Sequence, residues 1–472
     1  MFLNSGSLAV TSFATPEVWH AIVQFIIVAV AVLAGNILRR KVRLLRRSLM
    51  PSALLGGLII LLLKLWPAFN ELIDKRLMEV VTYHTLALGF IAMSLRASKD
   101  SNRANTRTVI DTGTLTIGTY IVQGIIGLLV TIPMFLWWRN PEVGRDIFYP
   151  GGLLLPMGYG QGPGQALNFG TIYQLGAAEQ GISFHGVDFG LSIATIGFLV
   201  GSVVGVIYMN ILNRKKKLTI NEVEVQTVHT IEDYESRNDI PHSESVDKLT
   251  VVSAIVLLTY GLVYLLMSFI GGLELGNFGE KTLKPLVYGF NFFWGILFGS
   301  FVKMIVKRLL KMGVMHREYL NEFLLNRISG FMFDIMIVAG TAAISFENLR
   351  SIWLPLTIVC VAGAIVTFLY VRWISFRIYP TYRYEGFFAM FGMLTGTASN
   401  GMILLREIDP YYDTPAANNL VLQNIPAMVL GFPVLLILGF APKSLSATLI
   451  SLGILVVAFI AATLFLLRKR KK

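Results

Sequence analysis

Two glycine-rich, polar segments interrupt otherwise apolar stretches of this chain, one in each half. The first covers residues 158–165 (Gly-Tyr-Gly-Gln-Gly-Pro-Gly-Gln), and the second covers residues 392–401 (Gly-Met-Leu-Thr-Gly-Thr-Ala-Ser-Asn-Gly). A bilayer offers no water to unpaired backbone groups, so irregular backbone persists at membrane depth only where protein buries it or where it lines a wet cavity. A matched pair of interrupted segments is the best sequence indication of a transporter's substrate and ion site.

Composition places the chain in a membrane. Hydrophobic residues make up 54% of the 472 residues and charged residues only 14%, whereas a soluble domain carries about a quarter charged residues. Many apolar runs approach the roughly 20 residues that a transmembrane helix needs. The chain is therefore expected to be an all-α polytopic membrane protein.

The basic residues indicate orientation rather than nucleic-acid binding. The formal net charge is +12 at pH 7, but the lysines and arginines cluster in short loops between apolar runs, which is typical of cytoplasmic loops. The single cysteine, Cys360, excludes an intrachain disulfide, and no His or Cys spacing predicts a transition-metal site.

The basic clusters also predict the membrane topology. Placing 39–47, 214–217 and 468–472 in the cytoplasm puts the N-terminus outside a bacterial plasma membrane and the C-terminus inside. The membrane helices are expected at about 19–38, 51–67, 79–96, 109–138, 187–212, 249–270, 286–306, 329–346, 351–375, 417–440 and 445–467.

The breaks complete a repeated pattern. The alternation of sides closes only if 150–180 and 385–405 each enter and leave from one face, as re-entrant segments. Each half then has four helices, a re-entrant segment and a fifth helix, and the two halves start on opposite sides. The expected fold class is an inverted repeat of two five-helix halves with an extra C-terminal helix. The expected parts are an external segment (1–18), the first repeat (19–212), a cytoplasmic linker (213–248), the second repeat (249–440), and the extra helix with a basic tail (441–472).

A weak internal similarity agrees with the repeat. Residues 87–95, in the third expected helix, resemble residues 338–346, in the eighth. By itself such a likeness between apolar segments could be chance. Together with the paired breaks it favours an inverted repeat.

The two loop tips form the predicted substrate site. Glycine permits φ > 0 and close approach of a ligand to the backbone, and broken helices offer N–H groups to a carboxylate. The alternative is that these glycines serve close helix packing, because glycine is common in membrane helices. The substrate-binding candidates are Gly158, Gly160, Gln161, Gly162, Gly164, Gln165, Gly396, Thr397, Ser399 and Asn400.

The second loop also offers oxygen atoms to Na⁺, a hard cation. The ion-binding candidates are Thr395, Thr397, Asn400 and Asp334. Asp334 lies inside the eighth expected helix, where a carboxylate is by default a functional hypothesis, although pairing with a nearby Asn or backbone group is an equal alternative. Lys64 and Lys303 lie near helix ends and are expected to extend toward the membrane surface.

On these segments the chain resembles the bacterial sodium/glutamate symporter family, over about residues 19–440. The resemblance is strongest in the two breaks and in 194–201 (Ala-Thr-Ile-Gly-Phe-Leu-Val-Gly) of the helix that follows the first break. It implies inverted five-helix repeats with opposed re-entrant loops, in a homodimeric, elevator-like carrier that moves glutamate. It also implies Na⁺ as the coupling ion and no other cofactor.

The chain departs from the family pattern in both loops. The family's first loop has Gly-Gly-His-Gly, and this chain has Gln161 at the position of the histidine. The second loop, 396–400, is shorter than in the family and lacks its proline. The helix expected at 445–467 is additional to the usual ten.

Two transport hypotheses follow. The first is Na⁺-coupled symport of glutamate or a related anionic amino acid by alternating access. The alternative is a carrier of another organic anion, proton-coupled through Asp334. An intramembrane enzyme would need a nucleophile–base or metal constellation within the spans, and the sequence contains no such pattern, so the chain is not expected to be an enzyme.

Overall fold

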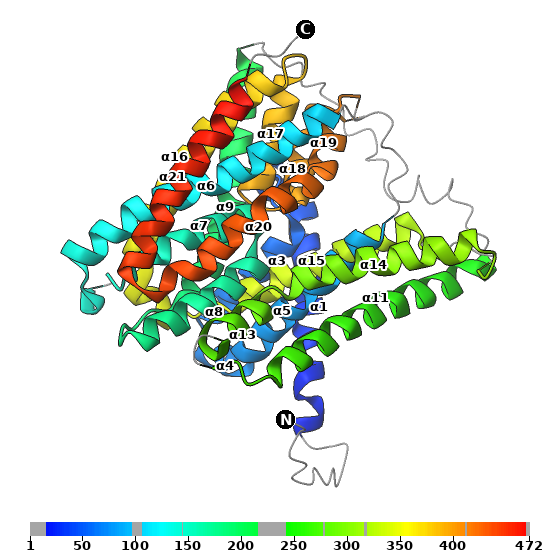
Figure 1. Ribbon diagram of the computed structural model, residues 1–472, viewed down its shortest axis with the longest axis horizontal. Coiled ribbons are helices and arrows are strands. Elements are labelled where there is room, and N and C mark those ends of the chain that lie inside the picture. The colour runs from blue at the N-terminus through cyan, green and yellow to red at the C-terminus, as the bar shows by residue number, and fades with distance from the viewer. Residues whose placement is uncertain are drawn as a thin grey trace.

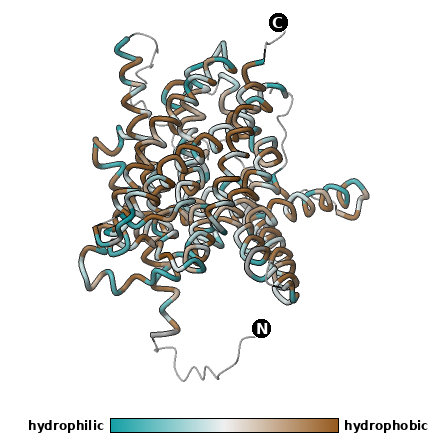
Figure 2. Tube along the Cα trace, turned by 60° about the vertical axis from the view of Figure 1, so that its left-hand side comes forward, coloured by the Kyte–Doolittle hydropathy of each residue, from teal (hydrophilic) through white to brown (hydrophobic). Residues whose placement is uncertain are grey.

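The computed structural model describes residues 16–96, 106–143, 145–215, 242–276, 279–315, 319–410 and 413–468, and every regular element in them is helical. Nine of the described helices are long and apolar enough to cross a membrane. Hydrophobic residues run along the lengths of the helices, and hydrophilic residues gather at helix ends and in loops (Figure 2). The expected all-α membrane class is therefore confirmed. Most of the expected external segment (1–18) and linker (213–248) lies outside the described residues.

Two of the eleven expected helices are not among these nine. α3 (Ser52–Leu63) has only 12 residues, a length of about 18 Å against a hydrocarbon core of about 30 Å. α14 (Asn291–Lys311) carries four basic residues in its second half. Both helices are present where the sequence predicts them, so the difference concerns length and charge rather than position.

The helices form two bundles, and each half of the chain contributes to both (Figure 1). The first bundle contains the earlier part of each half: α1 (Pro16–Lys41), α2 (Arg43–Arg47), α3, α4 (Pro67–Leu72), α5 (Lys75–Leu95), α11 (His242–Gly271), α13 (Lys284–Gly289), α14 and α15 (Glu322–Ala342). The second bundle contains the later part of each half: α6 (Thr106–Trp138), α7 (Leu154–Gln161), α8 (Pro163–Glu179), α9 (Gly186–Arg214), α16 (Phe346–Ile378), α17 (Arg383–Leu394), α18 (Ala398–Arg406), α19 (Ala416–Leu422) and α20 (Asn424–Phe440), with the additional helix α21 (Leu445–Leu467) against α6. Short turns of helix complete the connections: η1 (Pro141–Val143), η2 (Tyr149–Leu153), η3 (Gly279–Leu283) and η4 (Ala441–Lys443).

α5 and α15 pack extensively against each other. Each has 21 residues and begins after a short polar side chain that accepts a hydrogen bond from the helix. Asp74 accepts from the Leu77 amide, and Asn321 accepts from the Leu324 amide. These caps lie 247 positions apart, whereas the similar segments 87–95 and 338–346 lie 251 apart, a difference of about one helical turn. The two helices therefore begin alike, and their caps are about one turn out of register with the similar segments.

Two lysines repeat the same interaction in the two halves. Lys64 Nζ donates to the carbonyls of Ala342 (3.0 Å) and Ile344 (2.7 Å), at the C-terminal end of α15. Lys303 Nζ donates to the carbonyls of Ser94 (3.1 Å) and Arg96 (3.0 Å), at the C-terminal end of α5. A cation at a helix C-terminus satisfies free carbonyls and complements the helix dipole. The expectation that these lysines extend to the membrane surface is wrong for Lys64, which is buried, because each lysine caps a helix of the opposite half.

One expected helix is divided. The span predicted at 417–440 consists of α19 and α20, which meet at Gln423. Pro426 lacks an N–H group, so it cannot donate to the carbonyl four residues earlier, and a continuous helix loses a hydrogen bond there. Gln423 is fully buried at this junction and accepts a hydrogen bond from the Thr116 hydroxyl of α6 (2.8 Å).

The bundles meet along α8, which lies against α5, α15 and α13 of the first bundle. Asn168 Nδ2 donates to the Gly289 carbonyl at the end of α13 (2.7 Å). Phe293 of α14 and Phe432 of α20 stack with ring centroids 4.7 Å apart. The loop tip at the start of α8 therefore lies at the boundary between the bundles.

Candidate functional site

The first break lies between α7 and α8 at one residue, Gly162. Its φ is +80°, in the left-handed region that glycine adopts without strain. Pro163 follows at the first position of α8, where its missing N–H leaves no hydrogen bond unmade. The chain thus ends one helix and starts the next within a single residue.

The second break lies between α17 and α18 at Thr395–Thr397. The two helices pack back against each other, because a Cβ on Gly392 would lie 2.8 Å from the Gly401 Cα. Only residues without a side chain permit this approach. The chain therefore reverses at the break and forms a helical hairpin with the break at its tip.

The structure brings the two predicted tips together. A Cβ built on Gly162 would lie 3.3 Å from Thr397 Cγ2 and 3.8 Å from the Gly396 carbonyl oxygen. On the other side, a Cβ on Gly164 would meet Leu86 of α5 and Met336 of α15. The tips thus meet each other within the second bundle and face the first bundle.

Buried polar atoms without partners surround this meeting point. Gln165 is fully buried, and in the described part of the chain neither its Oε1 nor its Nε2 has a hydrogen-bond partner. The same is true of Thr397 Oγ1 and of Nδ2 of the fully buried Asn400. Buried polar groups are normally paired, and an unpaired one costs about 1–3 kcal/mol. These atoms are available to form hydrogen bonds with a polar ligand.

The ends of four helices also converge here. α8 and α18 present their N-termini, with free backbone N–H groups, and α7 and α17 present their C-terminal carbonyls. N-terminal N–H groups suit a carboxylate, and C-terminal carbonyls suit a cation. The arrangement can therefore bind charge of both signs without a charged side chain.

α9 supports the second tip from behind. A Cβ on Gly197 would lie 2.7 Å from the Thr395 carbonyl oxygen and 2.8 Å from Cδ1 of Tyr159. A Cβ on Gly201 would lie 2.6 Å from Asn400 Nδ2. The segment 194–201 therefore has glycines where the second tip and α7 approach α9 most closely.

The other predicted substrate residues have different surroundings. Gly158 packs against Ile193 and the Ala194 amide of α9, and Gly160 packs against the Tyr120 ring of α6. These two glycines fit the alternative reading as close-packing residues. Gln161 is partly exposed and Ser399 is exposed, both within one or two residues of a tip.

The four predicted ion ligands also have different surroundings. Thr397 and Asn400 lie at the tip, whereas the Thr395 hydroxyl already donates to the Phe391 carbonyl (2.7 Å). Asp334 is exposed on α15, and the described residues provide it no hydrogen bond or ion pair. It lies two residues before Met336, whose methyl group is 4.0 Å from the Cβ position of Gly162. Asp334 is thus on a neighbouring helix and outside the cluster of tip residues.

Sequence reasoning missed two residues of α6 that reach both tips. The Tyr120 hydroxyl donates to the Gly160 carbonyl (2.9 Å), and Gln123 Nε2 donates to the Leu394 carbonyl (3.0 Å). Gln123 is fully buried. A glutamine in the middle of an apolar span was the sequence signal, but its partner lies 271 positions away.

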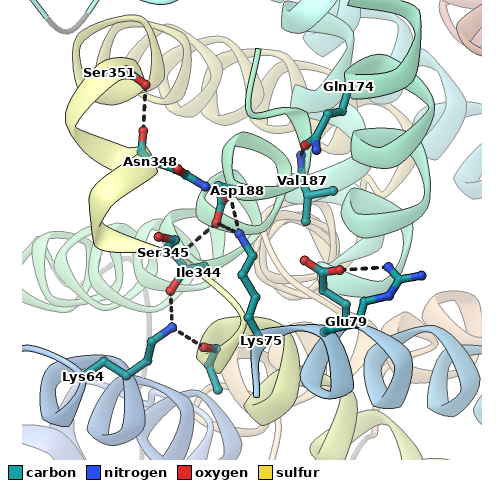
Figure 3. A network of polar contacts seen from close by, with 12 residues as sticks. Lys64, Lys75, Glu79, Gln174, Val187, Asp188, Ile344, Ser345, Asn348 and Ser351 are labelled. Atoms are coloured by element: carbon teal, nitrogen blue, oxygen red, sulfur yellow. Dashed lines mark hydrogen bonds and ion pairs between the residues drawn. The ribbon is translucent and has the colours of Figure 1, made fainter. Parts of the chain in front are cut away.

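A polar network also missed by sequence reasoning joins the bundles at another point (Figure 3). Asp188 of α9 is buried and accepts from Lys75 Nζ of α5 (2.8 and 3.0 Å). It also accepts from the Ser345 amide (2.8 Å) and from Asn348 Nδ2 (2.7 Å), at the start of α16. The buried carboxylate thus has partners in both bundles.

A second buried carboxylate lies close to the start of α16. The Asp146 amide donates to the Ser351 carbonyl (2.7 Å), and the carboxyl group is buried with Oδ1 unpaired. Burial raises the pKa of the Asp146 carboxyl above its ordinary value. Across the described residues, no group of three or more His, Cys, Asp or Glu side chains is placed to hold a metal ion.

The chain is similar to one known protein family over most of its length. The sequence profile of a family described as sodium/glutamate symporter matches residues 19–388. A comparison with curated proteins gives no match. The family match includes the first break and ends within α17, before the second break, so it stops short of the 19–440 inferred from the sequence.

Proposed function

The chain belongs to the sodium/glutamate symporter family, and from this premise we propose that it is a secondary carrier that moves glutamate or a related anionic amino acid together with Na⁺. The observation that carries the proposal is the meeting of the two loop tips at Gly162 and Thr397. Such paired breaks at a repeat interface are where secondary transporters bind substrate and ion.

The chemistry around the tips supports an anionic amino acid. A substrate carboxylate can accept from the N–H groups at the start of α8 and α18, and the Gln165 amide can both donate and accept. Gln165 has no other partner in the structure, so binding a polar substrate there would break no existing hydrogen bond of its side chain.

Oxygen atoms of the second tip support Na⁺ as the coupling ion. Thr397 Oγ1 has no partner among the described residues, and each carbonyl oxygen at the C-terminal ends of α7 and α17 has two lone pairs, so it can accept a further interaction. Each positive charge that enters with a potential of 100 mV gains about 2.3 kcal/mol. Two or more Na⁺ with one monoanion would use this potential to concentrate substrate.

The two-bundle architecture supports alternating access. The substrate tips belong to the second bundle and face the first across α8, so sliding of one bundle past the other would carry the site between the two sides. We place the carrier in a bacterial plasma membrane as a homodimer, with re-entrant breaks in an inverted repeat.

The proposed orientation has the N-terminus outside and the C-terminus inside. In a Cys360→Ser background, an impermeant thiol reagent added to intact cells should label Glu179→Cys, which follows the first break, and leave Lys311→Cys unlabelled. Both positions are exposed. Labelling of Lys311→Cys but not of Glu179→Cys would mean that the opposite orientation is correct.

The alternative is proton-coupled transport of another organic anion. It is favoured by Asp334, an exposed carboxylate on α15 without a hydrogen-bond or ion-pair partner among the described residues. In that mechanism Asp334 would bind and release the proton, and Asp334→Asn would abolish coupling.

Uptake into proteoliposomes separates the two functions. Radiolabelled glutamate, aspartate and citrate are offered with either a Na⁺ gradient or a pH gradient. We expect glutamate uptake with Na⁺ and no pH gradient, and little change in Asp334→Asn. Full uptake with a pH gradient in the absence of Na⁺, lost in Asp334→Asn, would replace the proposal with the alternative.

A further inference from the structure

We infer that α6 sets the position of the two loop tips relative to each other, through hydrogen bonds from Tyr120 and Gln123. This inference rests on the proposed function, because it concerns the geometry of the proposed substrate site. It names two positioning residues on a helix that contributes none of the predicted substrate or ion ligands.

The two donors reach equivalent points on the two breaks. The Tyr120 hydroxyl donates to the Gly160 carbonyl, two residues before Gly162. Gln123 Nε2 donates to the Leu394 carbonyl, the last residue of α17 before the second tip. Both carbonyls belong to the last turn of a helix, where no intrahelical partner exists. Tyr120 therefore fixes the end of α7, and Gln123 fixes the end of α17, next to the two tips.

The donors lie on one face of one helix. Residues three positions apart on an α-helix are neighbours on its surface, so Tyr120 and Gln123 are joined by a single rigid turn of α6. The distance between the two restrained carbonyl groups is then set by α6. A shift of either donor would change the spacing of the tips.

Packing around α6 reinforces both contacts. The Tyr120 ring lies directly against the Gly160 backbone, so a side chain at that position would collide with it. Gln123 Nε2 also donates to the Thr367 hydroxyl of α16 (2.9 Å). This second bond holds the amide in the orientation that directs its N–H toward Leu394.

Burying the Gln123 side chain also has an energetic cost. Its Oε1 is fully buried and has no partner. An unpaired buried oxygen destabilises a protein by about 1–3 kcal/mol, so stability alone does not account for a glutamine at this position. The hydrogen bond from Nε2 to the Leu394 carbonyl, at the end of α17, does account for the glutamine.

The test replaces each donor with a side chain of similar size that cannot donate: Tyr120→Phe and Gln123→Leu. We expect each variant to raise the substrate concentration for half-maximal uptake about tenfold, which corresponds to about 1.4 kcal/mol. The maximal rate should change less than about twofold, since the ligand-binding atoms themselves remain.

Tyr173→Phe is the matched control. Tyr173 is a fully buried tyrosine of α8 whose hydroxyl donates to the Leu438 carbonyl of α20 (2.9 Å). It loses the same kind of hydrogen bond as Tyr120→Phe, but far along α8 from the tips. We expect Tyr173→Phe to lower thermal stability by a similar amount and to leave half-maximal substrate concentration unchanged.

A distance measurement tests the geometry directly. Spin labels are placed at Gln161→Cys and Ser399→Cys, on the two loops, in a Cys360→Ser background. The distribution of distances between them should broaden or shift in Gln123→Leu and stay as in the parent for Tyr173→Phe. An unchanged distribution together with unchanged substrate affinity in both donor variants would overturn the inference.

The outcome is distinguishable from failure of the proposed function. If Gly162→Val abolishes uptake while Tyr120→Phe and Gln123→Leu keep parental affinity, the tips bind substrate and α6 does not position them. If Gly162→Val transports at the parental rate, the proposed site itself is wrong.

Discussion

Gly162 combines two demands that no other described glycine combines. Its backbone has φ +80°, and its Cα faces the opposite tip at Thr397 and Gly396. The other described glycines with positive φ are Gly181, Gly276 and Gly313, and none has an atom within 4 Å of its Cβ position. Among the described glycines, conformation and close packing therefore coincide only at the first loop tip.

Gly162→Val should abolish uptake with near-normal expression and membrane insertion. A β-branched residue at this φ is strained by about 1–3 kcal/mol, and its side chain would separate the tips. Uptake per inserted protein is the measurement. Gly181→Val carries the same backbone strain in open space and should transport near the parental rate. Equal loss of uptake in both variants would mean that backbone strain alone causes the loss.

Thr397→Ala should raise the Na⁺ concentration for half-maximal uptake about tenfold, or about 1.4 kcal/mol. Among the described residues the Thr397 hydroxyl has no partner, so its removal breaks no hydrogen bond seen there and should leave thermal stability unchanged. Thr448→Ala is the control, because that buried hydroxyl donates to the Ala441 carbonyl (2.8 Å). It should lower thermal stability without changing the Na⁺ dependence. Unchanged Na⁺ dependence in Thr397→Ala would exclude this hydroxyl as an ion ligand.

At the scale of the elements, α16 begins with a cap supplied by another helix. Ser345 holds the N-cap position but its own side chain makes no capping bond. Asp188 of α9 accepts from the Ser345 amide instead, and it pairs with Lys75 of α5. A carboxylate at a helix N-terminus complements the helix dipole. One residue thereby ties the start of α16 to α9 and to the first bundle.

Asp188→Ala should lower the apparent midpoint of thermal unfolding in detergent. It removes four hydrogen bonds from a buried site, a cost of about 1–3 kcal/mol or more. Arg76→Ala is the control, because the Arg76 side chain, which pairs with Glu79, is 81% exposed, and exposed pairs contribute about 0–1 kcal/mol. If both variants unfold at the same temperature, Asp188 is not a structural anchor between the bundles.

At the scale of the whole molecule, the two bundles each draw on both halves of the chain. α5 and α15 form the centre of the first bundle, and the two breaks meet in the second. Interactions across the boundary include the stacked rings of Phe293 and Phe432 and the contact of Leu286 with Gly439. Relative movement of the bundles must change these contacts.

A cross-link between the bundles should therefore stop transport. Leu286 of α13 contacts the backbone of Gly439 in α20, and Leu286 Cγ lies 3.4 Å from the Cβ position of Gly439, close enough for a disulfide. Leu286→Cys with Gly439→Cys, in a Cys360→Ser background, should lose uptake on oxidation and regain it on reduction. Each single variant should be insensitive to oxidant. Parental uptake by the fully cross-linked protein would exclude movement at this part of the boundary.

The class of the protein and the location of its breaks could be predicted from local sequence. Apolar runs of membrane length and glycine-rich interruptions such as 158–165 are properties of neighbouring residues, and the structure has helices and breaks where they predict them. The pairing of α5 with α15 was not predicted, although the similar segments 87–95 and 338–346 begin in these two helices. Apolar segments resemble each other at several offsets, so their similarity does not show which helices pack together.

The roles of individual residues were decided by tertiary contacts. Nothing local distinguishes Gly162, which forms a tip, from Gly158, which packs against α9. The capping by Lys64, the ion pair of Asp188 and the donation from Gln123 join residues between 113 and 280 positions apart. Sequence by itself determined the helical membrane class and the two breaks, because length, hydropathy and glycine content act locally. Only the folded chain determined which polar atoms are paired and which are left for a ligand, because pairing depends on which distant helices meet.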